Sequence, residues 1–265
     1  MISNLAYVHP DAKIGQNVTI EPFAYIGSDV VIGDDCHIGP GSQILPGTRM
    51  GKGCKVFGAI LGGEPQDLKF KGEYTTLEIG DYNTFREACT INRGTAAKGK
   101  TVIGSHNLFM ACSHIGHDVV VGSHCVIVNA VLVAGEVEIG DWAILGGNSA
   151  VHQFVRIGEH AMISGGSLVS KDVPPYVKAA RNPLSYVGAN FIGLRRRGFT
   201  SEKIGEIQEI FRILFQSGYG YTKACNIIEE SLPASPERDL IVNFVRDSKR
   251  GVIKPFNAKA GDSEE

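Results

Sequence analysis

An aliphatic residue recurs every six positions along most of this chain, and no other feature constrains its fold as strongly. The phase is lost between Gly62 and Thr76 and again in the polar stretch from Arg93 to Lys100. A fixed six-residue period is typical of a parallel β-helix, in which each hexad forms one short strand and one corner. We therefore expect a mainly β chain whose residues 1–180 wind into a triangular prism, three hexads to a coil. The repeat is carried by Val8, Ile14, Ile20, Ile26, Ile32, Ile38, Ile44, Met50, Val56, Ile79, Phe85, Ile91, Ile103, Phe109, Ile115, Val121, Ile127, Val133, Ile139, Leu145, Val151, Ile157, Ile163 and Val169.

The position four residues after each aliphatic residue is also restricted, because it is almost always small or β-branched. Both positions of the hexad must then face the interior of the prism. Since the sequence has no CxxC pair, we interpret the cysteines at this second position as core residues rather than zinc ligands or disulfide partners. They are Cys36, Cys54, Cys89 and Cys125.

The two interruptions of the repeat, near residues 62–76 and 93–100, predict loops that leave the prism. The first loop mixes charged and apolar side chains, among them Asp67, Lys69 and Phe70. Such loops commonly carry binding residues, but a plain solvated loop fits the same composition. The second loop contains two glycines, and we interpret it as a mobile turn.

Helical spacing replaces the hexads after Pro174, so we expect a C-terminal α-helical domain over residues 181–256. Residues 257–265 are polar and predict a disordered tail. N-cap and stop residues delimit the helices. The predicted helices cover residues 185–197, run from Thr200 or Ser201 to Gly218, cover residues 222–231, and run from Ser235 to Gly251.

Charge and the N-terminal residues argue against several classes of function. The formal net charge is -2, which gives no support for nucleic-acid binding. The chain starts without the basic and apolar regions of a signal peptide, and its longest apolar run, residues 119–135, is interrupted by polar side chains. We therefore expect a cytoplasmic protein with no membrane span and no nucleic-acid partner.

The stretch from Ala111 to Gly135 places two histidines and an aspartate in a repeat that otherwise uses small, aliphatic and turn residues. Because three hexads make one coil, residues eighteen apart should stack about 4.8 Å from one another. His117 would then lie beneath Gly135, and Gly135 beneath Gln153. A histidine beside a backbone amide is the arrangement of a general base next to an oxyanion donor.

The alternative is that His114 and His117 are ordinary surface histidines at corners of the prism. Asp118 follows His117 directly and should stack under Glu136. Two carboxylates near an imidazole add negative potential and raise its basicity. This charge favours the functional interpretation of His117.

A second stack of residues bears on assembly. Outward positions eighteen apart are apolar on one side of the prism, and a monomer would expose this stripe to water. Prism sides pack naturally around a threefold axis, and the stripe lies close to His114 and His117 in the repeat. We therefore expect a homotrimer with sites in the clefts between subunits. The stripe consists of Leu108, Val126, Ile144 and Met162.

Three consecutive arginines, residues 195–197, end a predicted helix. Their charges complement the dipole at a helix C-terminus. They also suit phosphate binding, because a guanidinium group donates two parallel hydrogen bonds. Both interpretations stay open from the residues alone.

Several motifs, in order and at compatible spacing over nearly the whole chain, resemble the acyl-carrier-protein:UDP-N-acetylglucosamine O-acyltransferases, hexapeptide-repeat enzymes of lipid A synthesis. The motifs are Gly63–Phe70 (GEPQDLKF), Ile91–Thr95 (INRGT), His114–Asp118 (HIGHD), Ala150–Phe154 (AVHQF), Asp172–Tyr176 (DVPPY) and Gly193–Phe199 (GLRRRGF). The resemblance implies that the prism is a left-handed parallel β-helix. It also implies transfer of a 3-hydroxyacyl group from acyl carrier protein to the glucosamine 3-hydroxyl of UDP-N-acetylglucosamine, with no cofactor and no metal.

The resemblance also assigns residue roles. His117 matches the general base, Asp118 its supporting carboxylate, and Gly135 the backbone amide that faces the oxyanion. Gly165 matches the position that limits the depth of the acyl chain, and glycine there implies a long acyl group. His114 matches a substrate-contacting histidine. Asp67 and Lys69 match the sugar-side loop, and Gln153, Asn190 and Arg197 match the nucleotide-binding set.

Three positions depart from the family's usual pattern. Asn92 stands where histidine is common, Glu136 replaces a histidine after Gly135, and Ile192 replaces an acidic residue. The choice between an oxygen and a nitrogen acceptor at sugar position 3 therefore stays open.

Three other functions use the same repeat, because a fold does not fix a function. A carbonic anhydrase of the γ type needs three zinc-binding histidines, but its paired histidines lie five apart and His114 and His117 lie three apart. A related N-acyltransferase carries an additional N-terminal domain, for which the hexads starting at Val8 leave no room. A non-catalytic scaffold predicts that His117 is dispensable.

Overall fold

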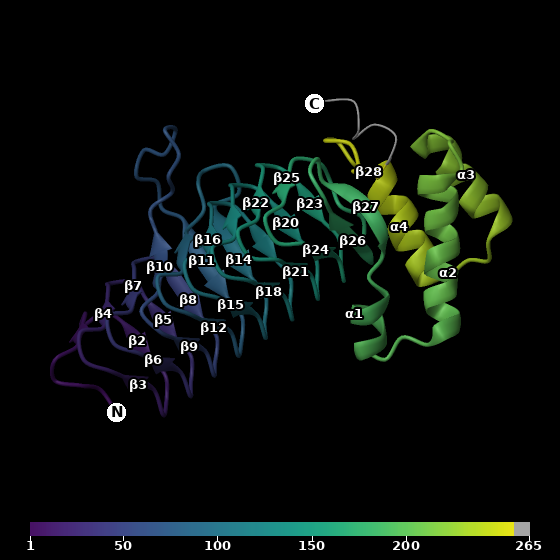
Figure 1. The fold of residues 1–265 in the computed structure, drawn as a ribbon. Helices are drawn as coiled ribbons and strands as arrows, with labels where there is room; N and C mark the ends of the chain where they lie inside the picture. The colour runs from purple at the N-terminus through teal and green to yellow at the C-terminus, as the bar shows by residue number, and fades with distance from the viewer. Residues whose placement is uncertain (257–265) are drawn as a thin grey trace.

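Short strands follow one another around a common axis and form the three faces of a prism, with a group of helices at its C-terminal end (Figure 1). The computed structural model describes residues 1–256, and the tail predicted for residues 257–265 lies outside the described residues. Face 1 consists of β1 (Tyr7–Val8), β4 (Tyr25–Ile26), β7 (Gln43–Ile44), β10 (Ile60–Gly63), β13 (Thr90–Asn92), β16 (His114–Ile115), β19 (Leu132–Val133), β22 (Ala150–Val151) and β25 (Leu168–Val169).

Faces 2 and 3 are built in the same way. Face 2 consists of β2 (Lys13–Ile14), β5 (Val31–Ile32), β8 (Thr48–Met50), β11 (Thr76–Ile79), β14 (Lys100–Ile103), β17 (Val120–Val121), β20 (Glu138–Ile139) and β23 (Arg156–Ile157). Face 3 consists of β3 (Thr19–Ile20), β6 (His37–Ile38), β9 (Lys55–Val56), β12 (Thr84–Phe85), β15 (Leu108–Phe109), β18 (Val126–Ile127), β21 (Ile144–Leu145), β24 (Met162–Ile163), β26 (Val177–Ala180), β27 (Ser185–Ala189) and β28 (Lys254–Pro255). The chain turns the first corner between faces 1 and 2, the second between faces 2 and 3, and the third between faces 3 and 1.

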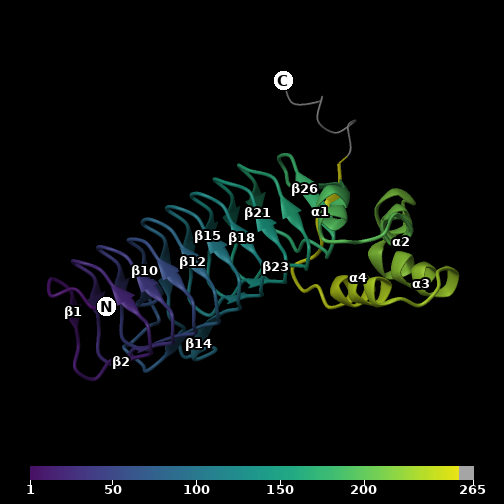
Figure 2. The same ribbon diagram turned by 90° about the horizontal axis from the view of Figure 1, so that it is seen from below.

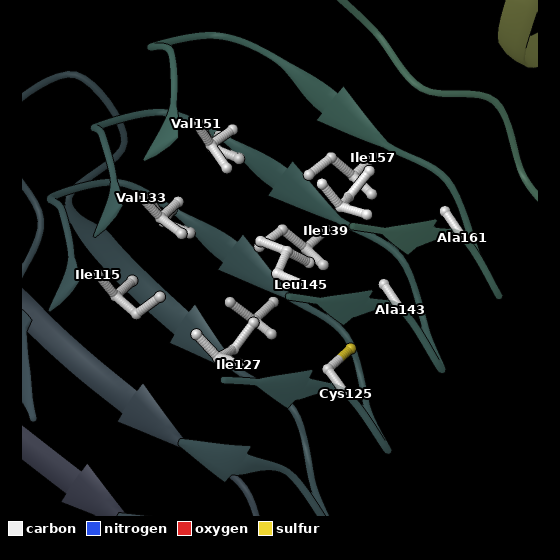
Figure 3. Packing of buried hydrophobic residues seen from close by; sticks show 14 of the residues in the cluster. Ile115, Cys125, Ile127, Val133, Ile139, Ala143, Leu145, Val151, Ile157 and Ala161 are labelled. Carbon is white, nitrogen blue, oxygen red and sulfur yellow. The ribbon is translucent and has the colours of Figure 1, made fainter. Parts of the chain in front are cut away.

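Strand pairing confirms the coil length that the repeat predicts. His114 pairs with Leu132 and Ile115 with Val133, in parallel and eighteen residues apart. The aliphatic and small positions of the hexads fill the interior of the prism (Figure 3), where Ile115 and Cys125 are fully buried. Burial of this continuous apolar column is the main stabilising term of the fold.

Glycine follows the aliphatic residue in many hexads, and its backbone φ is not positive at these positions. A Cβ at Gly116 would stand 2.8 Å from the amide nitrogen of Gly135 in the next coil. The left-handed conformation falls two residues later, at Asp118 with φ 60° and at Glu136 with φ 60°. Glycine is thus required by the close approach of neighbouring coils.

The helix predicted over residues 185–197 is wrong in its first half. Ser185–Ala189 forms β27, which pairs antiparallel with β26 and parallel with β28. The open edge of face 3 offers unpaired backbone groups, and β27 satisfies them where a helix would leave them exposed. Only α1 (Phe191–Arg196) is helical, with Asn190 as its N-cap.

The remaining helices pack together beyond the last coil (Figure 2). The N-caps of the first and the last are Thr200 and Ser235, as the sequence predicts, but the last helix ends five residues before Gly251. Within residues 1–256, no helix is both long enough and apolar enough to cross a bilayer. The helices are α2 (Ser201–Phe211), its π-helical continuation η1 (Arg212–Gln216), α3 (Tyr221–Ser231) and α4 (Pro236–Arg246).

Candidate active site

The first corner of the prism carries the predicted catalytic residues. His117 and Asp118 lie between β16 and β17, Gly135 lies one coil further on, and Gln153 one coil beyond that. Both interruptions of the repeat, residues 64–75 and 93–99, leave the prism at this same corner, and the first projects beyond β10 in Figure 1. A cavity of about 580 Å³ lies here, lined by Gln66, Asp67, Leu68, Lys69, Asn92, His114, Gly116, His117, Ala134, Gly135 and Gln153.

The imidazole of His117 is bound on one side by a buried carboxylate. Its Nδ1 lies 2.8 Å from Oδ2 of Asp118, which is fully buried. A carboxylate only accepts hydrogen bonds, so Nδ1 carries the proton and donates it. The lone pair is therefore on Nε2, which is the arrangement that a general base requires.

Asp118 is held by residues 93–100, which we had interpreted from the sequence as a mobile turn. In the structure this turn is bonded to the site, because the carboxylate accepts hydrogen bonds from Thr95 N at 2.9 Å, Thr95 Oγ1 at 2.6 Å and Lys98 N at 3.3 Å. Thr95 was thus missed as a site residue. The only signal was its place at the end of the INRGT motif.

The backbone amide of Gly135 has the freedom that an oxyanion donor needs. Among the described residues, no backbone carbonyl or side chain accepts a hydrogen bond from this N–H. At the second corner the corresponding amide of Ser123 is bound by Oδ1 of Asp141, one coil further on, at 2.7 Å. Gln153 occupies the position of that aspartate above Gly135, so the amide stays available to a ligand.

Two side chains of face 1 line the cavity beside His117. Nδ1 of His114 lies 2.7 Å from Oγ1 of Thr90, and burial lowers the pKa of His114, which keeps the ring neutral near pH 7. Asn92 donates through Nδ2 to the carbonyl of Glu64 at 2.6 Å, while its Oδ1 is buried without a partner among the described residues. His114, which the resemblance assigns as a substrate contact, therefore lines the cavity.

The loop from 62 to 76 reaches over the first corner and contributes to the cavity. Oδ2 of Asp67 lies 3.9 Å from Nε2 of His117. Oδ1 of Asp67 accepts from the backbone N–H of Lys69 at 2.9 Å, which closes a tight turn at the loop's tip. Asp67 and Lys69, the two residues predicted from this loop, therefore line the cavity.

The second carboxylate near His117 is therefore Asp67 and not Glu136. The backbone N–H of Glu136 donates to the carbonyl of His117 at 2.9 Å. The side chain of Glu136 lines a separate cavity of about 410 Å³, together with Lys98 and Arg156. The backbone of Glu136 stacks one coil above Asp118 as predicted, but its side chain points away from His117 and into the other cavity.

The other predicted site residues lie at different corners of the chain. Asn190 caps α1 and donates to the carbonyl of His160 at 2.9 Å. Arg197 donates to the carbonyl of Trp142 at 2.9 Å and lies over its ring, at the second corner. Gly165 lies at the third corner, where a Cβ would stand 3.0 Å from the carbonyl oxygen of Gly147. Of the predicted nucleotide-side residues, only Gln153 lines the cavity in a single chain.

Comparison with known proteins decides the family. Residues 29–63 match the bacterial transferase hexapeptide family, and residues 172–253 match domain 2 of UDP N-acetylglucosamine O-acyltransferase. The acyl-[acyl-carrier-protein]–UDP-N-acetylglucosamine O-acyltransferase of Chlorobaculum parvum is 56% identical, over 96% of this chain and 97% of that protein. The chain belongs to this O-acyltransferase family.

Solved structures of the O-acyltransferase family share the whole fold. The UDP-N-acetylglucosamine acyltransferase of Bacteroides fragilis superposes with a TM-score of 0.95 and 52% identity, over 96% of this chain and 100% of that one. The O-acyltransferase of Moraxella catarrhalis gives a TM-score of 0.92 and 39% identity, over 96% and 99% of the two chains. These matches confirm the predicted left-handed parallel β-helix with a C-terminal helical region.

Within residues 1–256, no group of three or more His, Cys, Asp or Glu side chains is placed to hold a metal ion.

Proposed function

We propose that this protein transfers a long-chain (R)-3-hydroxyacyl group from acyl carrier protein to the glucosamine 3-hydroxyl of UDP-N-acetylglucosamine, the first step of lipid A biosynthesis, in the cytoplasm. The observation that carries the proposal is the His117–Asp118 pair, in which the imidazole lines the cavity directly against Gly135 and the carboxylate is buried behind it. Family membership supports it, because the relatives are named for this reaction.

The chemistry follows from these groups. Nε2 of His117 takes the proton of the sugar hydroxyl as its oxygen attacks the thioester carbonyl carbon. The carbonyl oxygen becomes an oxyanion, which accepts a hydrogen bond from the Gly135 N–H. When the intermediate collapses, the carrier's thiolate leaves and takes the proton back from His117, while Asp118 stabilises the transient imidazolium.

The substrate contacts divide between the cavity and other corners. Within one chain, Asp67, Lys69 and His114 line the cavity and would bind the sugar, and Gln153 extends it. Asn190 and Arg197, assigned to the nucleotide, are held at the second corner by contacts with His160 and Trp142. A site that contains all of these residues needs a second copy of the chain.

We therefore propose a homotrimer with active sites between subunits. The predicted stripe lies in register on the outer side of face 3, since Leu108 pairs with Val126, Val126 with Ile144, and Ile144 with Met162. All four side chains stay partly exposed in the single chain. Packing faces against one another around a threefold axis would bury the stripe.

Acyl transfer from a panel of 3-hydroxyacyl carrier proteins to UDP-N-acetylglucosamine tests this function, with wild type and His117→Ala side by side. The wild type should prefer long chains, and His117→Ala should lose at least about two orders of magnitude in turnover. Undiminished turnover in His117→Ala would overturn the mechanism. The 3-amino analogue of the sugar nucleotide, assayed in parallel, decides between an oxygen and a nitrogen acceptor.

The same panel tests Gly165 as the residue that limits chain length. Gly165→Leu adds a side chain at the third corner, and its optimum should shift to shorter acyl groups while turnover with short chains is retained. An unchanged optimum would remove Gly165 from this role.

A further inference from the structure

We propose that Thr95 is a positioning residue for the His117–Asp118 pair, and that Glu73 fixes the turn that carries Thr95. The inference rests on the proposed role of His117 as general base. In this proposal, residues 93–100 orient the carboxylate of Asp118 during the reaction.

Thr95 holds the Asp118 carboxylate at two points. Its backbone N–H binds Oδ1 at 2.9 Å and its hydroxyl binds Oδ2 at 2.6 Å, the oxygen that also accepts from Nδ1 of His117. Bonds to both oxygens set the rotation of the carboxyl plane. Because Oδ2 is shared, that rotation sets the orientation of the imidazole, and with it the direction of Nε2.

The hydroxyl of Thr95 is itself oriented. Its Oγ1 accepts from the N–H of Ala97 at 3.2 Å, which leaves its proton free to point at Asp118. Thr95 is buried, and Lys98 N adds a third bond to the carboxylate at 3.3 Å. A buried charge needs such a complete set of donors, and removing one leaves the carboxylate free to turn.

Glycines let the turn fold back on Asp118. A Cβ at Gly94 would stand 2.3 Å from the backbone nitrogen of Lys100, so no larger residue fits beside the returning chain. Gly99 has φ 73°, and its N–H closes the turn on the carbonyl of Thr95 at 2.7 Å. The backbone geometry of the turn thus places Thr95 beside the carboxylate of Asp118.

Glu73 connects this turn to the loop that carries Asp67 and Lys69. One oxygen of its carboxylate accepts from the N–H of Ala96, next to Thr95, at 3.0 Å, and the other accepts from the N–H of Lys71 at 2.8 Å. The neighbouring Tyr74 is anchored in turn, because its hydroxyl donates to Asp29 at 3.1 Å. Both loops of the first corner therefore form one bonded unit around the cavity.

Thr95→Val and Thr95→Ser are the decisive pair, since valine keeps the shape and the backbone N–H but loses the hydroxyl. Thr95→Val should lower kcat about 10-fold to 100-fold, as expected for a misoriented base, with KM for UDP-N-acetylglucosamine within about twofold of wild type. Thr95→Ser should restore kcat. Thr48→Val is the matched control. Thr48 is buried, its hydroxyl bonds the carbonyls of Leu45 and Leu61, and it lies in β8, three strands from β17 along face 2.

Wild-type kcat in Thr95→Val would overturn the proposal, and so would a raised KM with unchanged kcat. Melting temperatures are measured for both variants, and Thr95→Ala replaces Thr95→Val if the valine variant does not fold. His117→Ala separates the two hypotheses: retained turnover there overturns the proposed function, whereas a silent Thr95→Val beside an inactive His117→Ala overturns only the role of Thr95.

A double-mutant cycle tests Glu73. If Glu73 acts through the turn, Glu73→Ala lowers kcat in the wild type but has little further effect in the Thr95→Val background. Fully additive effects on kcat would show that Glu73 acts independently of Thr95.

Discussion

The imidazole of His117 lies directly against the Cα of Gly135, so closely that a Cβ at position 135 would stand 2.5 Å from Nε2. The proposed base and the proposed oxyanion donor thus lie at the same corner of the prism, in neighbouring coils. Only a residue without a side chain leaves Nε2 open to the cavity. The relationship explains why glycine is needed at position 135, where its backbone conformation alone does not require it.

Gly135→Ala should therefore lower kcat/KM by about 100-fold or more, because the added methyl group displaces the imidazole from its productive position. Steady-state kinetics with both substrates check this. Gly205→Ala is the control, since a Cβ there meets nothing within 4 Å in the exposed middle of α2. The control should keep full activity and gain about 0.5–1 kcal/mol of unfolding free energy. Near-normal activity of Gly135→Ala would contradict the arrangement.

Asp118→Asn should lower kcat by about two orders of magnitude. An amide keeps the size of the side chain but turns an NH₂ group toward either the Thr95 donors or Nδ1 of His117. The tautomer with the lone pair on Nε2 is then no longer favoured. Kinetics at a saturating concentration of UDP-N-acetylglucosamine measure the effect, and a variant with unchanged kcat would show that the buried carboxylate serves stability alone.

Ile144→Asp should dissociate the proposed trimer and abolish activity together with it. A charge in the middle of the face 3 stripe cannot be buried against another copy without a partner. Light scattering should then give a mass near that of one chain, 28.4 kDa. Val31→Asp places the same charge at an outward position of face 2 and should leave both mass and activity unchanged. A monomeric wild type would disprove the trimer outright.

Acidification should destabilise the fold through His160. Burial, followed by the charge of Arg197, lowers the pKa of His160 to about 4, whereas an unfolded histidine titrates near 6.5. As the pH falls, the unfolded chain therefore takes up a proton at this histidine before the folded chain does. The stability that the neutral His160 contributes is complete above about pH 6.5 and is lost as the pH falls toward 4. Denaturation at several pH values should give a shallower loss over this window for His160→Asn, since asparagine tolerates the left-handed backbone at φ 57°. Parallel pH profiles would exclude His160 as a source.

Much of the site was predictable because the hexad repeats without interruption from Ile103 to Val169. A regular coil places residues eighteen apart in register, so the contact of His117 with Gly135 follows from counting. The small inward cysteines, such as Cys125, follow from the same period. In a regular coil, the repeat in the sequence predicts which residues of neighbouring coils contact one another.

The interruptions follow no such rule. Nothing in the spacing relates Thr95 to Asp118, or Asp67 to His117, because the loops between strands have no period. The strand at Ser185–Ala189 was missed for a related reason. Its pairing depends on the open edge of β26, which the spacing of the segment itself does not report.

The sequence by itself determined the prism, its coil length and the stacking of His117 beneath Gly135, because an apolar side chain buried once in every six residues sets three hexads to a coil. Only the tertiary structure decided how Asp118 is held, which carboxylate approaches His117, and that Asn190, Arg197 and Gly165 lie at other corners of the chain. Those relationships arise where non-repeating segments fold back on the prism, and each depends on hydrogen bonds between residues with no fixed separation in sequence.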